Sequence, residues 1–232
     1  EQATFTGWDR DGGYATHVVA GADVAFALPD LGPSYAAEGD AAVAPLLCGG
    51  VIGYRSLHIA GVTAATAPGL RLGLYGFGAS ATVVLQVARH WGADVHVVTR
   101  SDSEAARALA LGATSARTYA EGPPVRLDAA ITFAPAGAVV VAALQALDRG
   151  GVVAVNAIHL DEVPAFDYDD LWHERVVRSV ANVTRADVRE FLALVAEAGV
   201  RTTFETMALD DAAHALERLR DGDIAGAVVL RP

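Results

Sequence analysis

Strand-like and helix-like segments alternate along the chain from about residue 71 onward. Short apolar runs such as RLGLY and DVHVV are each followed by a stretch with apolar residues at helical spacing, in ASATVVLQVARHWG and SDSEAARALALGA. Serines and acids begin the second of these helices, and a glycine ends each of them. Such a series buries its strands in a parallel sheet covered by helices. We therefore predict an α/β fold with a doubly wound parallel sheet.

The two ends of the chain lack this alternation. Residues 1–45 contain glycine, proline and short β-like pieces such as YATHVVA, whereas residues 201–232 are predicted to form a strand, a helix and a strand. Neither end is long enough to bury a core of its own, so we expect both to belong to one incomplete second domain. The predicted division is 1–45, then a sheet domain at 46–183, then a return to the second domain at 184–232.

Composition narrows the class of function. The 232 residues are 53% hydrophobic and 19% charged, which is ample for a buried core. A formal net charge of −11, with no basic cluster, disfavours nucleic acid and anionic membranes as partners. The N-terminus lacks the pattern of a secretory signal, no long apolar run predicts a membrane span, and one cysteine cannot form an internal disulfide. We expect a cytoplasmic protein that acts on small molecules.

A glycine-rich turn lies between the first predicted strand and its helix, in LGLYGFGASATV. Its pattern is G-x-G-x-x-A: Gly76 permits a tight turn, and Gly78 lets backbone amides approach a pyrophosphate at the helix N-terminus. Such a turn can also be a tight corner without a ligand, but the flanking strands and helix lie where a dinucleotide site requires them. The residues predicted to surround the pyrophosphate are Gly76, Phe77, Gly78, Ala79, Ser80 and Ala81.

The end of the second predicted strand indicates which dinucleotide binds. An acid there would bind the ribose hydroxyls of NAD, whereas a basic or hydroxyl group would bind the 2′-phosphate of NADP. The chain has Thr99, Arg100 and Ser101 at this place, and the first acid, Asp102, comes later. This favours NADP over NAD, unless Arg100 is a solvated loop residue. A methyltransferase using S-adenosylmethionine is disfavoured, because it typically needs an acid near the turn and another at the end of this strand.

Several segments, in the expected order, resemble the medium-chain, zinc-dependent alcohol dehydrogenases, particularly the bacterial propanol-preferring type. FTGWDRDGGYATHVV is similar to the segment after the structural-zinc lobe, APLLCGGVIGYRSL to the segment of the third zinc ligand, and GLYGFGASATVVLQVARHWGADVHVVTRS to the cofactor turn. The resemblance covers nearly the whole chain. It implies a Rossmann NAD(P)-binding domain flanked by part of a GroES-like, β-rich catalytic domain. The implied reaction is hydride transfer between a small primary alcohol or aldehyde and NAD(P).

The resemblance implies a role for the single cysteine, Cys48. In the family a Cys, a His and a Cys or Asp hold the catalytic zinc while a fourth position stays open, and Cys48 matches the last of these ligands. Without the resemblance, a lone cysteine in an apolar run is usually an inert small hydrophobe. The other ligands would precede FTGW, and the scattered histidines form no metal motif. We therefore expect the chain to be an incomplete form of the enzyme, inactive alone.

Other site residues and alternatives follow from the same resemblance. LDAAITFA and GVVAVNAI are predicted to form further strands, the fourth and fifth, and Ala134 and Asn156 lie at their ends. The resemblance implies that these two residues border the adenosine ribose and the nicotinamide. A zinc-free quinone or enoyl reductase of the same superfamily would not need Cys48, and a non-catalytic dinucleotide-binding module also fits the chain. We further expect a homodimer or homotetramer. The aromatic residues of PAFDYDDLWHERVV are expected to pack against their own domain.

Overall fold

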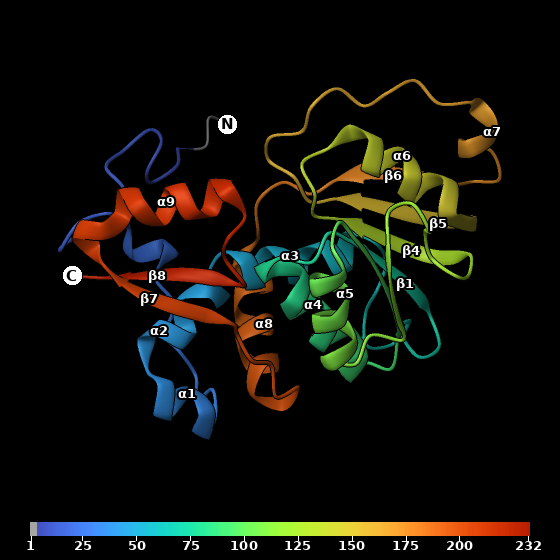
Figure 1. Cartoon of the computed structure of the whole chain (residues 1–232). Helices are drawn as coiled ribbons and strands as arrows, with labels where there is room; N and C mark the ends of the chain where they lie inside the picture. The colour runs from blue at the N-terminus through green and yellow to red at the C-terminus, as the bar shows by residue number, and fades with distance from the viewer. Residues whose placement is uncertain (1–3) are drawn as a thin grey trace.

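The computed structural model describes residues 4–232, and its centre is a six-stranded parallel sheet (Figure 1). The strands are β1 (Arg71–Tyr75), β2 (Asp94–Thr99), β3 (Ser115–Thr118), β4 (Leu127–Thr132), β5 (Leu147–Val155) and β6 (Val176–Ser179). Their order is β3-β2-β1-β4-β5-β6, so the chain runs outward in one direction from β1 and in the other from β4. The predicted doubly wound α/β fold is confirmed. Ligands of such sheets bind at the reversal, beyond the carboxyl ends of the strands.

Helices cover both faces of the sheet. Leu72 and Leu74 of β1 are fully buried in a core shared with α3 (Gly49–Ile59), α4 (Ala79–His90) and α8 (Arg185–Glu197). Tyr75 points to the opposite face, into a second core against α6 (Gly137–Ala146). Burial on both faces explains why these strands are continuous apolar runs rather than alternating ones.

The helices begin where local sequence predicts. α5 (Asp102–Ala110) starts after Ser101, whose hydroxyl accepts a hydrogen bond from the Glu104 amide at 3.3 Å. α8 starts with a capping box, in which Thr184 and Asp187 each bind the other's backbone amide. These caps fix the ends of helices that flank the sheet.

A second, smaller sheet lies near the C-terminus. It consists of β7 (Phe204–Ala208) and β8 (Ala227–Arg231), which are parallel and joined through η3 (Leu209–Asp211) and α9 (Ala212–Asp221). The prediction of strand, helix and strand in this region is confirmed. Figure 1 shows this unit beside the main sheet, near the short helices of the N-terminal region.

The N-terminal region contains short helices where β-like pieces were expected. These are η1 (Ala22–Val24), α1 (Pro33–Glu38), α2 (Asp40–Val43) and η2 (Ala44–Leu46). The strand expected at YATHVVA is wrong: residues 14–20 form bends and irregular backbone, and Val19 is 94% exposed. An alternating pattern makes a strand only when a neighbouring strand pairs with its backbone. In the described residues, the pairing of this region is one isolated bridge between Thr6 and Arg10.

One stretch, Asp40–Ile59, has the length and mean hydropathy of a membrane-crossing helix. In the structure, half of it is buried, and a turn at residues 47–48 separates η2 from α3. Leu46 and Leu57 are fully buried in the core beneath the sheet. The apolar composition of this stretch therefore serves internal packing.

The aromatic residues after β5 do not pack as expected. Phe166, Tyr168 and Trp172 are 40%, 67% and 53% exposed, so the prediction that they are covered by their own domain is wrong. They lie in the long connection around α7 (Tyr168–Leu171), which Figure 1 shows at the periphery beside α6. The rings of Tyr168 and Trp172 contact each other, with centroids 5.6 Å apart. A one-turn helix at the rim offers too little surface to bury them.

Candidate nucleotide-binding site

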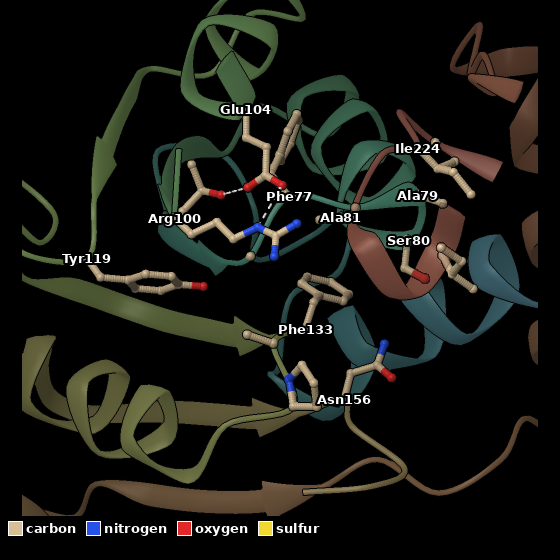
Figure 2. A pocket seen from close by; sticks show the side chains of 18 residues that line it. Phe77, Ala79, Ser80, Ala81, Arg100, Glu104, Tyr119, Phe133, Asn156 and Ile224 are labelled. Carbon is tan, nitrogen blue, oxygen red and sulfur yellow. Dashed lines mark hydrogen bonds and ion pairs between the residues drawn. The ribbon is translucent and has the colours of Figure 1, made fainter. Parts of the chain in front are cut away.

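A cavity of about 580 Å³ lies at the carboxyl end of the sheet, where the strand order reverses. Its lining residues come from the ends of β1, β2, β4 and β5 and from the segment after α9, and Figure 2 shows Tyr119 and Ile224 on opposite sides of it. All predicted cofactor residues except Ser101 line it. These are Gly76, Phe77, Gly78, Ala79, Ser80, Ala81, Thr99, Arg100, Ala134 and Asn156.

The glycine turn has the geometry that a phosphate site needs. Gly76 has a φ of 93°, which disfavours other residues, and its amide donates to the Val98 carbonyl at 2.8 Å. A Cβ built on Gly78 would meet no heavy atom within 4 Å, so the space beside the turn is open. The Thr82 amide makes the bond to the Gly78 carbonyl that closes the first turn of α4, and the amides before it have no intrahelical partner. Those amides and the helix dipole favour an anion here.

Arg107 of α5 supports the turn from behind. Phe77 is 2% exposed, and the Arg107 guanidinium lies 5.3 Å from the centroid of its ring. The same guanidinium donates a hydrogen bond to the Phe77 carbonyl. The sequence analysis missed this role, because no spacing rule links a residue in the middle of one helix to the turn before another.

The end of the cavity beside β2 carries two opposite charges. Arg100 Nε lies 3.6 Å from Glu104 Oε1, and the Thr99 hydroxyl donates to Glu104 Oε2 (Figure 2). Glu104 was not predicted at the site, because it follows the strand by several residues. Its signal was its place three residues after the helix cap Ser101, which brings the first turn of α5 back over the end of β2. Burial raises the pKa of the neighbouring Tyr119, and the Glu104 carboxylate raises it further.

Ser101 itself lies outside the lining. Its hydroxyl accepts from the Glu104 amide and lies 3.1 Å from the Ser103 hydroxyl. Its predicted contact with the ribose stays a prediction, while its observed role is to cap α5.

The connections after β4 and β5 form the opposite end of the cavity. The Phe133 amide donates to the Tyr75 carbonyl at 2.8 Å, and the Asn156 amide to the Thr132 carbonyl at 2.9 Å. These bonds continue the sheet pairing beyond the strands and bring both residues beside the glycine turn. In Figure 2, Asn156 lies on the side of the cavity away from Tyr119.

The C-terminal segment supplies the remaining wall. Leu219, Gly222, Ile224 and Gly226 line the cavity from the connection between α9 and β8. Gly222 ends α9 in the left-handed conformation, with a φ of 77°. A Cβ on Gly222 would lie 2.8 Å from Arg100 Nη2, so the guanidinium reaches this helix end.

Cys48 lies near the cavity but does not line it. It is exposed and immediately precedes α3. A Cβ on the next residue, Gly49, would lie 3.1 Å from the Ser80 hydroxyl, so this end of α3 adjoins the first turn of α4. Among residues 4–232, no group of three or more His, Cys, Asp or Glu side chains could hold a metal ion. The described residues alone therefore do not fit a zinc site.

Comparison with known proteins agrees with this geometry. Residues 81–197, half of the chain, match a family model described as zinc-binding dehydrogenase. A probable alcohol dehydrogenase of Mycobacterium tuberculosis (strain CDC 1551 / Oshkosh) is 47% identical over 230 residues. The chain belongs to the zinc-binding dehydrogenase family. The match covers 99% of this chain but 64% of the relative, so the chain spans less than two thirds of the relative's length.

Solved structures extend the comparison. The alcohol dehydrogenase of Aeropyrum pernix has a TM-score of 0.85 at 24% identity, covering 99% of this chain and 68% of that one, and shows the shared fold. CAD from Helicobacter pylori, complexed with NADP(H), has a TM-score of 0.70 at 25% identity, covering 81% and 54%. The resemblance to the family of zinc-dependent alcohol dehydrogenases is confirmed by the family model and by the Mycobacterium tuberculosis relative.

Proposed function

We propose that this chain is the dinucleotide-binding part of an alcohol dehydrogenase that interconverts a small primary alcohol and its aldehyde with NAD(P). The observation that carries the proposal is the cavity at the strand reversal, where an open glycine turn, a helix N-terminus and Arg100 meet. The name of the Mycobacterium tuberculosis relative supports alcohol as the substrate class.

The residues of the chain have separate tasks in this proposal. The amides at the start of α4 face the pyrophosphate, and Arg107 keeps the turn in place by binding the Phe77 carbonyl. Arg100 binds the adenosine end and favours NADP, which the NADP(H) complex of the Helicobacter pylori protein supports. Asn156 borders the nicotinamide end, and Ala134, after β4, borders the adenosine ribose. A bound nicotinamide supplies the hydride acceptor or donor.

The expectation that zinc is bound rests on the family and not on the residues of this site. The described residues lack a complete donor set, so no step of the proposal is assigned to a metal. Cys48 as a ligand remains a prediction that requires further donors.

Cofactor titration tests the proposal. Fluorescence of the reduced nicotinamide is followed as the protein is added to NADPH or NADH, and both are expected to bind, NADPH more tightly. Gly78→Val should weaken binding of both cofactors by about tenfold or more, because its Cβ would stand in the open space beside the turn, with no protein atom within 4 Å. Gly13→Val is the matched control, since a Cβ there also meets nothing within 4 Å, away from the cavity. Absence of binding by the unaltered protein, or full binding by Gly78→Val, would overturn the proposal.

The alcohol assignment has its own assay. The assay uses a form of the protein that also supplies the further zinc donors, since this chain alone is expected to be inactive. Absorbance of the reduced nicotinamide is followed with NADP and a series of primary alcohols, and with NADPH and quinones or enones. Turnover confined to quinones or enones would replace the alcohol dehydrogenase with the reductase alternative.

A further inference from the structure

We infer that Glu104 is a specificity-determining residue, whose carboxylate opposes the 2′-phosphate of NADP and thereby limits the preference that Arg100 creates. This inference rests on the proposed function, because it concerns the same cofactor cavity. It adds to that function an acidic residue acting against the basic one.

The carboxylate of Glu104 is held at the cavity wall. One oxygen accepts from the hydroxyl of Thr99, which is fully buried, and the other lies 3.6 Å from Arg100 Nε. The side chain is 21% exposed, and it belongs to the first turn of α5, where the helix dipole stabilises a negative charge. These contacts hold the carboxylate beside Arg100 at the cavity wall.

The charges around this carboxylate are few. Among the residues that line the cavity, the two charged ones are Arg100 and Glu104, so their formal charges cancel. The Arg100 side chain is 68% exposed, and its guanidinium also approaches Gly222 at the C-terminal end of α9. Arg100 Nε and Glu104 Oε1 form an ion pair at 3.6 Å, so the carboxylate lowers the net positive charge that Arg100 presents to the cavity.

NADP and NAD interact differently with Arg100 and Glu104. A 2′-phosphate carries close to two negative charges and is attracted by Arg100 but repelled by the carboxylate beside it. A ribose 2′-hydroxyl is neutral and can donate a hydrogen bond to a carboxylate. Glu104 therefore weakens binding of NADP and leaves binding of NAD unchanged or slightly favoured.

Removing the charge tests the inference. Glu104→Gln keeps an oxygen that can accept from Thr99 but removes the negative charge. Kd values for NADPH and NADH are measured by nicotinamide fluorescence for the unaltered protein and the variant. We expect the ratio of the NADH Kd to the NADPH Kd to rise by about tenfold, mainly through tighter NADPH binding. Thermal unfolding of each protein confirms that it is folded.

A matched control separates this effect from overall charge. Asp102→Asn removes the same charge from the same turn of α5, but Asp102 is exposed and does not line the cavity. In Asp102→Asn the ratio of the NADH Kd to the NADPH Kd should change by less than about twofold, because exposed charges are screened by solvent and salt. An equal change in both variants would overturn the inference, since it would show a general charge effect.

A variant that removes the positive charge of the pair is the second test. Arg100→Gln leaves the carboxylate without its partner and should weaken NADPH by about tenfold or more while NADH changes little. Binding of both cofactors with an unchanged ratio in Glu104→Gln would overturn the inference alone. Binding of neither cofactor by the unaltered protein would overturn the proposed function as well, so the two failures are distinguishable.

Discussion

Replacing Gly53 with alanine should destabilise the protein, although alanine is the better helix former. Gly53 lies in the middle of α3, where the change to alanine alone would stabilise by about 1 kcal/mol. A Cβ there would lie 2.7 Å from Val84 Cγ2 and 3.3 Å from the Ser80 carbonyl oxygen, both on α4. Val84 is fully buried and branched at Cβ, so it has little freedom to rotate away.

Overpacking of a close contact costs about 1–3 kcal/mol, which exceeds the gain in helix propensity. We therefore expect Gly53→Ala to lower the free energy of unfolding by about 1 kcal/mol, and the melting temperature by roughly 2–4 °C for a chain of this size. Because the contact displaces the first turns of α4, cofactor binding should weaken too. Urea and thermal unfolding measure the first effect, and fluorescence titration the second.

Gly49→Ala is the control for this prediction. The added Cβ would lie 3.1 Å from the Ser80 hydroxyl, which can rotate away. The free energy of unfolding of Gly49→Ala should therefore stay within about 0.5 kcal/mol of that of the unaltered protein. A Gly53→Ala protein as stable as the unaltered one, or more stable, would refute the argument that backbone proximity requires glycine there.

Three further substitutions test individual contacts. Arg107→Ala should raise the Kd for NADPH about 3–10-fold by loosening the glycine turn, and an unchanged Kd in titration would contradict that role. Thr184→Ala should cost about 1 kcal/mol in urea unfolding through loss of the α8 cap, whereas no loss would show the cap to be dispensable. Hydrogen bonds from Arg71 hold the pKa of Asp128 below its usual value, so the pair stabilises above about pH 4 and this contribution disappears as pH falls through the folded-state pKa. Arg71→Gln should therefore lower the free energy of unfolding at pH 7, by no more than about 1 kcal/mol because the pair is partly exposed. The difference from the unaltered protein should shrink in acid, and a difference independent of pH would count against the pairing.

The central sheet was predictable because its signals are local. β1 and β2 are buried on both faces, so their sequences are continuous apolar runs. Ser101 caps the start of α5, and the glycines Gly92 and Gly112 follow the ends of α4 and α5. β3 and β6 lie at the edges and are more exposed, and the sequence analysis did not single them out. The error at YATHVVA has the same origin, since pairing depends on residues distant in sequence.

Site residues were predictable where they directly follow a strand, and less so where their role depends on the direction of a side chain. Gly76, Gly78 and Arg100 follow strands directly, and the topology brings strand ends together. Glu104 and Arg107 reach the site from inside α5, and their roles depend on how that helix returns across the sheet. The wall made by the segment after α9 depends on contacts between the two ends of the described chain. No local pattern encodes these approaches.

The closeness of Arg100 to Gly222 limits what either position can become. A side chain at residue 222 would need a left-handed backbone, and its Cβ would lie 2.8 Å from Arg100 Nη2. A larger residue there would displace the guanidinium that lines the cavity, so the sequence at the end of α9 and the charge in the cavity cannot vary independently.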